Sequence, residues 1–540
     1  MCGDQATSAL SDLSNHSLEE VQTQVKEVRE VVSSKVVQIT SDTKEGSEAM
    51  GNYARRIWRV SNYWRTPPAC NSGNESAGSP QSRILIVFSD TGGGHKASAN
   101  SLKAALEHSF PGEVDVRVRD VMEDYTLWPS NRIYNYWSSI PWLWGAIYNS
   151  TKKTHSLTGD AFLLDPARVM EPSVLEGFIR CVQEEQPDVI ISVHPILQSA
   201  PRACTSHYKH GKRIPFATVV TDLGEAHPWW FNASVDRLFV PIESMREQAL
   251  QFGFSAAQVE VVGLPLRQGF WKVDPSSANR ERIRDKLGLA ADHPVVLIMG
   301  GGDGMGKLAE CARSFIDMED PGAPNAPQIV IICGKNEVVR TSLQAAATKR
   351  AAQFAIAPRV LGFVSNMDEW MLAAAVLVTK AGPGTIAEAC CSGLPILLFD
   401  FLPGQEEGNV KFVVEGEMGV FVDRARDAAT VCKSWLADPA KLAGFREKSL
   451  AAARPQSSLQ IATKLGALIE QARSARLEEA RGQGAGEWGV GDKGAEVGGK
   501  EDAAGGKGGG KFELRSSWWT WLSLANKDRA PSWWREVPID

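Results

Sequence analysis

Two glycine-rich segments each follow a short apolar run, and each could bring the backbone close to a bound anion. The first is Ser89–His95, in which three glycines come directly before His95. The second is Gly300–Gly306, which contains Gly301 and Gly302. Glycine allows tight turns and close approach to a ligand, and a helix that begins after such a turn offers free N–H groups to phosphate. Neither segment ends in Gly-Lys-Ser or Gly-Lys-Thr, so we do not expect the phosphate loop of an ATPase.

A third segment, Lys380–Ala389, joins an apolar run to a predicted helix through a Gly-Pro-Gly turn. Gly382 and Gly384 would let the backbone approach phosphate, and Thr385 would add a hydroxyl. Glu388 lies one turn into the helix. A carboxylate there cannot help to bind phosphate, but it can accept two hydrogen bonds from a ribose diol. A glutamate that only stabilises the helix N-terminus is the alternative.

A fourth segment follows one strand and helix later and contains Gln405, Glu406 and Asn409. Amide and carboxylate side chains suit the hydroxyl groups of a sugar. The segment alone is an ordinary polar loop, and its position after the phosphate turn is what makes it informative.

These segments need a scaffold, and the chain predicts an α/β fold built twice. From Ser82 onward, short apolar strands alternate with helices, which favours an open parallel sheet with helices on both faces. The pattern begins again near Val295, after a polar stretch from Arg267 to His293 that we interpret as a connection. His95 would face the cleft at the carboxyl end of the first sheet, where ligands bind in such folds. A helix-capping histidine on a structural turn is the alternative.

We therefore divide the chain into four parts. Residues 1–81 are predicted to form an N-terminal helix and linker, 82–266 a first Rossmann-like domain, 267–475 a second Rossmann-like domain, and 476–540 a Gly-rich, disordered and Trp-rich tail. The predicted strands and helices of the two domains are at 84–88, 96–108, 114–118, 189–193, 216–220, 237–240, 259–262, 295–299, 307–315, 328–332, 360–363, 376–379 and 395–399.

The composition excludes several classes of protein. The net charge is −6, so no basic field for nucleic acid is expected. The nine cysteines include no Cys-x-x-Cys pair, which argues against a disulfide framework and a zinc site. No apolar run approaches the ~20 residues of a membrane-spanning helix. The N-terminus lacks the apolar core of a secretory signal, and acidic residues outnumber basic ones before Ala54, so no clear transit peptide is evident.

Three segments could contact a membrane or pack on the protein itself, and the sequence leaves both readings open. Residues 17–39 predict a helix with near-heptad apolar spacing, begun by a capping box of Ser17 and Glu20. The stretch Trp128–Tyr148 is rich in aromatic residues and predicts an interfacial loop or an internal cluster. Five tryptophans lie in the last thirty residues.

In this order, the segments resemble the monogalactosyldiacylglycerol synthases of plastids, a family related to the bacterial lipid-linked N-acetylglucosaminyltransferases of peptidoglycan synthesis. The matching segments are Ser89–Ser98, Thr221–Phe231, Gly300–Gly306 and Lys380–Ala389. The resemblance covers roughly residues 82–470. It implies a GT-B fold, in which two Rossmann-like domains face each other across a cleft.

The resemblance also implies a reaction: inverting, metal-independent transfer of galactose from UDP-galactose to 1,2-diacylglycerol. It implies that the second domain holds the donor through Gly301, Gly302, Gly382, Gly384, Thr385, Glu388, Gln405, Glu406 and Asn409. On the acceptor side it implies roles for Gly93, Gly94, Pro129, His227 and Trp230, of which Pro129 and Trp230 match positions linked to acceptor or anionic-lipid binding. Phosphatidylglycerol or phosphatidic acid would be such lipids, no cofactor is expected, and a homodimer is left open. The family implies a peripheral place at the chloroplast envelope.

The acceptor hydroxyl needs a general base. His95 or Asp222 could serve, and the sequence does not choose between them. Two other functions remain: a related lipid-linked hexosyl- or N-acetylglucosaminyltransferase, and a nucleotide-sugar-binding module without catalysis. The presence of His95, Glu388 and Gln405 argues against the second.

Overall fold

The structure is a computed structural model. It describes residues 81–90, 94–126, 140–158, 177–198, 214–302, 304, 306–318, 321 and 326–484. The chain separates into two compact units, Met1–Ala480 and Arg481–Asp540. Everything described below belongs to the first unit, apart from the last turn of its C-terminal helix.

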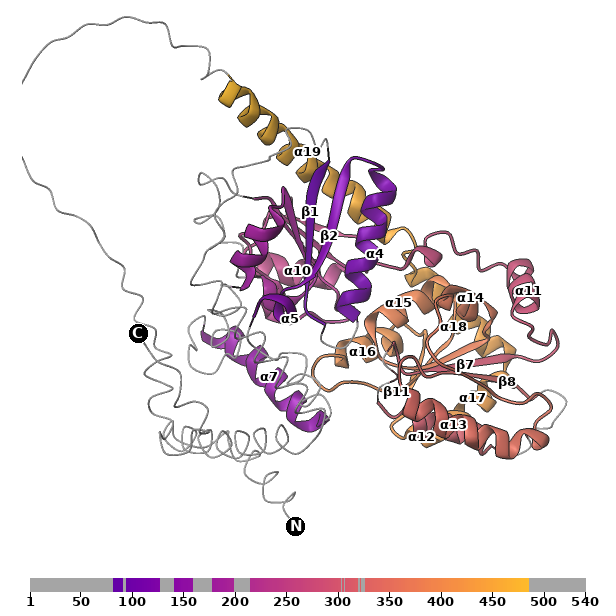
Figure 1. Cartoon of the computed structure of the whole chain (residues 1–540). Coiled ribbons are helices and arrows are strands. Elements are labelled where there is room, and N and C mark those ends of the chain that lie inside the picture. The colour runs from indigo at the N-terminus through magenta and orange to yellow at the C-terminus, as the bar shows by residue number, and fades with distance from the viewer. Residues whose placement is uncertain are drawn as a thin grey trace, which may run out of the picture. The chain divides into compact units, whose positions relative to one another are not determined.

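The first sheet has six parallel strands in the order β2-β1-β3-β4-β5-β6 (Figure 1). The strands are β1 Ser82–Phe88, β2 Val114–Asp120, β3 Val189–Ser192, β4 Phe216–Val219, β5 Arg237–Val240 and β6 Val259–Val261. Side chains of β1 alternate between two cores. Ile84 and Ile86 pack with helix α4, Gly94–Ser109, whereas Leu85 and Val87 pack on the opposite face. Because both faces are buried, the strands consist largely of apolar residues rather than of apolar and polar residues in turn.

The second sheet also has six parallel strands, in the order β12-β11-β10-β7-β8-β9. They are β7 Val295–Met299, β8 Gln328–Ile332, β9 Arg359–Leu361, β10 Val376–Lys380, β11 Ile396–Asp400 and β12 Gly419–Phe421. Numbered within the sheet, this is the Rossmann order 3-2-1-4-5-6. The predicted α/β fold with two Rossmann-like halves is confirmed.

Helices cover both faces of the second sheet. On one face lie α12 Leu308–Ile316, α13 Glu337–Arg350 and α17 Ala428–Leu436, and on the other lie α14 Met367–Ala373 and α15 Pro383–Cys391. Figure 1 shows α12 and α13 together below β7 and β8. The remaining helices are α5 Val121–Tyr125, α7 Pro141–Thr158, α10 Glu243–Gln251, α11 Ser277–Lys286, α16 Glu407–Glu415, α18 Pro439–Ala452 and α19 Ser457–Gly484, together with a helix over 177–185.

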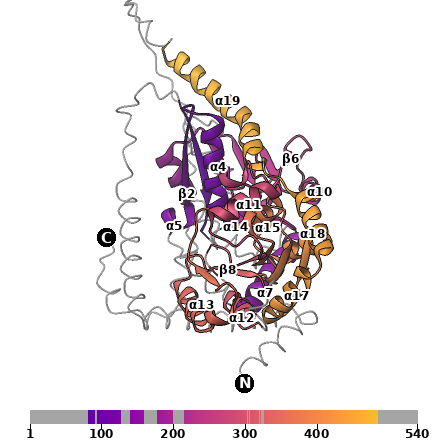
Figure 2. The same cartoon turned by 90° about the vertical axis from the view of Figure 1, so that its right-hand side faces the viewer.

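The last helix returns to the first sheet, which the sequence did not predict. Figures 1 and 2 both show α19 beside α4. Ile461 and Leu465 of α19 share a core with Leu102 and Leu106 of α4. Arg476 forms an ion pair with Asp188 at 3.3 Å, just before β3. Along the sequence, the first sheet therefore comes before the second, and the C-terminal helix α19 packs against the first sheet again.

Four local predictions differ from the structure. The stretch 267–293 is more than a connection, since it contains α11, which packs on α14. Residues 407–409, expected in a loop, begin α16, and residues 141–148, expected in an interfacial loop, belong to α7. The helical pattern continues beyond residue 475 to Gly484. The predicted domain bounds stay predictions, and residues 17–39 and the Trp-rich tail lie outside the described residues.

Candidate active site

The candidate acceptor site lies where the strand order of the first sheet reverses, between β1 and β3. Ligands bind at such a switch point because the connections after the two strands diverge there and leave a crevice. His95 is in the first turn of α4, directly after β1, and its Nδ1 lies 2.8 Å from the carbonyl oxygen of Val193, directly after β3. The Oγ1 atom of Thr221 lies 2.9 Å from the same nitrogen.

These contacts define the chemistry of His95. A carbonyl oxygen only accepts hydrogen bonds, so we assign the proton to Nδ1, which leaves a lone pair on Nε2. No described residue bonds Nε2. The ring of His194 lies 4.4 Å away, centroid to centroid. Burial lowers the pKa of His95 to about 4. The imidazole is therefore neutral at pH 7 and able to accept a proton through Nε2.

Asp222 is the second buried titratable group here. Its Oδ2 accepts a hydrogen bond from Nε1 of Trp230 at 2.6 Å. Burial raises the pKa of Asp222 to about 6, although the bonds from Trp230 and from the backbone N–H of His227 act in the opposite direction. Trp230 also lies 6.2 Å from the ring of His95. Its side chain is fully buried, so in this structure it positions Asp222, and its predicted contact with lipid stays a prediction.

His227 connects this site to α7. Its Nδ1 accepts from the backbone N–H of Trp229, so Nε2 carries the proton, and Nε2 lies 3.1 Å from Oγ1 of Thr151. The ring of Tyr148, one turn earlier in α7, lies edge-on to His227 at 4.8 Å. His227 is buried, and it therefore fixes α7 against the loop that carries Asp222.

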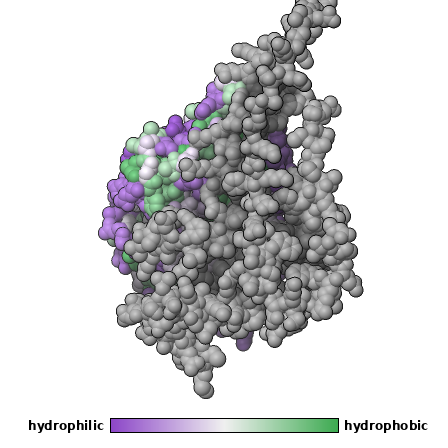
Figure 3. All heavy atoms as spheres, turned by 90° about the vertical axis from the view of Figure 1, so that its left-hand side faces the viewer, coloured by the Kyte–Doolittle hydropathy of each residue, from purple (hydrophilic) through white to green (hydrophobic). Residues whose placement is uncertain are grey.

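Helix α7 exposes part of its aromatic content. Trp142 is 58% exposed, whereas Trp144 and Tyr148 are half-buried. Figure 3 shows one face of the molecule, on which the visible described residues mix hydrophobic and hydrophilic side chains.

Residues 127–139, which include Pro129, lie outside the described residues, as does Gly93. Gly94 begins α4, and a Cβ atom added to it would meet nothing within 4 Å.

The candidate donor site lies at the switch point of the second sheet, between β7 and β10. Gly301 and Gly302 follow β7, and Gly382 precedes α15, directly after β10. Gly301 has a φ of 77°, which favours glycine. The carbonyl oxygen of Gly302 accepts a hydrogen bond from Lys335 N–H at 3.0 Å, which fixes the turn. The structure thus brings the two predicted phosphate turns onto adjacent strands.

The first turn of α15 is open to a ligand. A Cβ atom on Gly384 would meet nothing within 4 Å, and one on Gly382 would come nearest to Oγ1 of Thr385. Pro383 at the first helical position has no N–H to satisfy, and its ring fixes the φ that a helix needs. The N–H groups of this turn can therefore face an anion, and their contact with a diphosphate stays a prediction.

Glu388 is buried and forms a bidentate ion pair with Arg267. Nε of Arg267 donates to Oε1 at 2.6 Å, and Nη2 donates to Oε2. Burial opposes the charge of Arg267, but the attraction of Glu388 raises the pKa of the guanidinium. Arg267 was not predicted as a site residue, since it lies 121 positions from Glu388 in a stretch interpreted as a connection.

The predicted galactose residues make internal contacts in this structure. Glu406 is buried and accepts from Nζ of Lys380 at 2.5 Å and from Leu402 N–H at 2.8 Å. Asn409 is buried and donates to the carbonyl of Ala381 at 2.9 Å. Gln405 is half-buried. These residues lie beside the phosphate turn, and their contact with a sugar stays a prediction.

A close backbone contact joins the two halves next to these residues. The Oδ1 atom of Asn409 accepts from the N–H of Gly224 at 3.0 Å, two residues after Asp222. A Cβ atom on Gly224 would lie 1.8 Å from the carbonyl oxygen of Gly408. Only glycine fits there, and nothing in the local sequence of either residue indicated the contact.

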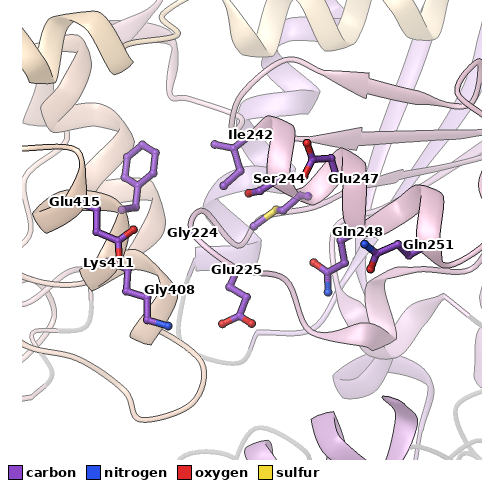
Figure 4. Close-up of a pocket in the computed structure, with 12 residues that line it drawn as sticks. Gly224, Glu225, Ile242, Ser244, Glu247, Gln248, Gln251, Gly408, Lys411 and Glu415 are labelled. Atoms are coloured by element: carbon purple, nitrogen blue, oxygen red, sulfur yellow. The ribbon is translucent and has the colours of Figure 1, made fainter. Parts of the chain in front are cut away.

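A pocket of about 590 Å³ lies beside this contact (Figure 4). Gly408, Lys411 and Glu415 line one side, and Ile242 and Gln248 line the other. The pocket contains none of the residues predicted to bind donor or acceptor.

Among the described residues, no group of three or more His, Cys, Asp or Glu side chains could hold a metal ion. No helix in the described part of the chain has both the length and the apolarity needed to cross a bilayer.

Two family models match the chain. The model described as "Monogalactosyldiacylglycerol (MGDG) synthase" covers residues 95–266, and the model "Glycosyltransferase family 28 C-terminal domain" covers residues 295–426. The first range includes His95 and Asp222, and the second includes the two glycine turns and Glu388, whereas Arg267 lies between the two ranges.

Two curated relatives match most of this chain and most of their own length. The "Probable monogalactosyldiacylglycerol synthase, chloroplastic" of Glycine max is 38% identical over 409 residues, which are 74% of this chain and 74% of that protein. "Monogalactosyldiacylglycerol synthase 2, chloroplastic" of Arabidopsis thaliana is 35% identical over 396 residues, 72% of this chain and 81% of that protein. Among solved structures, MurG of Acinetobacter baumannii aligns with a TM-score of 0.46 and 14% identity, over 72% of this chain and 99% of that one. The extent and identity of the curated matches show that the chain belongs to the monogalactosyldiacylglycerol synthase family.

Proposed function

We propose that this chain transfers galactose from UDP-galactose to the free hydroxyl of 1,2-diacylglycerol and makes monogalactosyldiacylglycerol. Membership of the family supports this activity. The observation that carries it is the pairing of two sites: a neutral, oriented histidine at one switch point and two glycine turns at the other.

The reaction inverts the anomeric carbon. The acceptor oxygen attacks this carbon from the face opposite the diphosphate, the bond from carbon to the diphosphate oxygen breaks, and its electron pair leaves with UDP. The proton of the acceptor hydroxyl passes to a base, for which Nε2 of His95 and the carboxylate of Asp222 are the candidates. The bond from His95 to Val193 favours His95, since it leaves Nε2 as an acceptor. Asp222 is held by Trp230 and His227.

The second sheet holds the donor. Gly301, Gly302, Gly382, Gly384 and Thr385 meet the diphosphate, whose charge the N-terminus of α15 helps to balance. Glu388 accepts the ribose hydroxyls, and Arg267 fixes its carboxylate in place. The ring of Phe363, 64% exposed after β9, offers an aromatic surface to uracil. Gln405, Glu406 and Asn409 lie toward the galactose. No metal ion or other cofactor takes part in this scheme.

The acceptor is a membrane lipid, so the enzyme works at a membrane surface. We propose peripheral attachment at the chloroplast envelope through the first half, with α7 and its exposed Trp142 in contact with lipid. The chloroplastic names of the relatives support the compartment. Phosphatidylglycerol or phosphatidic acid strengthens attachment, with Pro129 and Trp230 near the lipid.

The test is incubation of the full chain with diacylglycerol micelles and either radiolabelled UDP-galactose or radiolabelled UDP-N-acetylglucosamine, followed by chromatography of the lipids. We expect a labelled galactolipid from the first donor, in the presence and absence of EDTA. A product from UDP-N-acetylglucosamine alone would assign a different sugar. Complete inhibition by EDTA that Mg²⁺ reverses would reveal a metal site.

A further inference from the structure

Lys380 lies between the two glycine turns of the second sheet. It is the last residue of β10, at the switch point. Its Cε is 3.7 Å from where a Cβ atom on Gly301 would stand, and its Nζ is 3.9 Å from the same position on Gly382. The side chain is 23% exposed. An ammonium group therefore lies between the two turns, where a crevice is expected at the switch point.

The ammonium is fixed by one strong contact. Nζ donates to Oε1 of Glu406 at 2.5 Å, and the other oxygen of Glu406 accepts from Leu402 N–H. Glu406 is buried and is thereby held at both oxygens. An ammonium has three N–H donors, and within the described residues Glu406 is its one hydrogen-bond partner. Two donors remain for a ligand in the crevice.

The charge of the crevice would otherwise depend on backbone dipoles. Arg267 is engaged with Glu388, and Lys307 is directed to Asp400, with 4.0 Å between Nζ and Oδ1. Helix N-termini attract phosphate but carry only about half an elementary charge each. Lys380 is also paired with a carboxylate, but among these groups it is the cation whose Nζ lies between the two glycine turns and keeps N–H donors for a diphosphate.

We propose that Lys380 is a catalytic residue that binds the diphosphate of the donor and stabilises the negative charge on departing UDP. Glu406 is its positioning residue. As the bond from the anomeric carbon to the diphosphate oxygen breaks, the electron pair stays on that oxygen, and Lys380 keeps its proton and donates hydrogen bonds to it. This assignment rests on the proposed function, because it takes the crevice as the donor site.

The test compares Lys380→Met, Lys380→Arg and a control, Lys433→Met, in the full chain. Lys433 is an exposed lysine of the same half, on α17. Dissociation constants for uridine, UMP and UDP are measured by calorimetry, and kcat is measured with UDP-galactose. For Lys380→Met we expect unchanged uridine binding, UDP binding weakened about 10- to 100-fold, and kcat reduced about 10²-fold. Lys380→Arg should recover most of the UDP affinity, and Lys433→Met should match the wild type.

Each other outcome overturns the assignment. Equal weakening of uridine and UDP would show that Lys380 only shapes the loop through Glu406, and unchanged UDP binding would show that it does not contact the diphosphate. If Lys380→Met fails to fold, Glu406→Gln provides the second measurement, since it keeps the lysine charge and loosens its anchor. It should retain UDP binding and lower kcat, and loss of UDP binding would contradict the proposal. A wild type that binds UDP but transfers no galactose would refute the proposed function alone.

Discussion

At the scale of single residues, burial acts in opposite directions on the two candidate bases. It disfavours the charged form of each, so it lowers the pKa of His95 to about 4 and raises that of Asp222 to about 6. A base must be deprotonated to act. His95 therefore stays available in acid where Asp222 already carries a proton, and the pH dependence of the rate distinguishes them.

We expect His95→Ala to reduce kcat by about 10²- to 10⁴-fold with little change in the KM for UDP-galactose. The reason is that Nε2 of His95 is an oriented, neutral acceptor in the acceptor site, while the donor binds to the second sheet. Steady-state kinetics at saturating diacylglycerol measures both constants.

The pH profile of kcat/KM of the wild type provides the check. An acid limb near pH 4 agrees with His95. A limb near pH 6, together with a near-normal kcat in His95→Ala and no activity in Asp222→Asn, would assign the base to Asp222 instead.

Glu388→Ala should raise the KM for UDP-galactose by 10-fold or more and leave the protein folded. One or two charge-assisted hydrogen bonds to ribose would be lost, which are worth roughly 2–4 kcal/mol. Arg267 would also lose its partner. Donor titrations measure the effect, circular dichroism checks the fold, and an unchanged KM would remove Glu388 from the donor site.

The sequence predicted those site residues that belong to short local motifs, and it did not predict residues whose partners are distant in the chain. The glycine turns and Glu388 stand in short segments whose pattern indicates a strand, a turn and a helix. Arg267 and Gly224 could not be found in this way, because their partners, Glu388 and Asn409, are 121 and 185 positions away. Lys380 lay within a recognised segment, and only the fold shows that its side chain lies between two turns.

At the scale of elements, apolar runs predicted the described strands except β12, which has only three residues, because both faces of a parallel sheet are buried. Helices that pack through few apolar residues were harder to predict. Helix α11 buries only Ile283 and is otherwise polar, so it was interpreted as a connection. The role of α19 follows from tertiary packing on α4, which no local pattern contains.

Trp142→Ser should weaken binding to liposomes that contain phosphatidylglycerol, because α7 would lose its exposed ring. Flotation at low and high salt separates the electrostatic contribution to binding from the hydrophobic one, since salt screens the attraction of basic residues but not the burial of a ring. The matched control removes everything after residue 484, and it should float as the wild type does. Binding that is lost only with this truncation would transfer the membrane contact from α7 to the tail.

At the scale of the whole molecule, catalysis requires the base on one sheet to reach the donor on the other. Within the first unit, the contact between Gly224 and Gly408 holds the loop that carries Asp222 against the start of α16. Asn409 strengthens it, since its side chain bonds Gly224 and also Ala381, the residue before the phosphate turn. Asp222 lies two residues from the contact, so a change there displaces the acceptor site relative to the donor.

Gly224→Ala tests this relation. The new Cβ would stand 1.8 Å from the carbonyl oxygen of Gly408 and 2.8 Å from the backbone nitrogen of Asn409, so the two backbones must separate. A displacement of about 1 Å at reacting atoms can cost about 10²-fold in rate. We expect kcat to fall by at least 10-fold while the dissociation constant of UDP stays within 2-fold, because the donor turns belong to the second sheet alone. Gly444→Ala is the matched control, since a Cβ there meets nothing within 4 Å and alanine suits α18 better than glycine. Calorimetry with UDP and steady-state transfer rates give the two quantities, and a normal kcat in Gly224→Ala would show that the contact does not align the two sites.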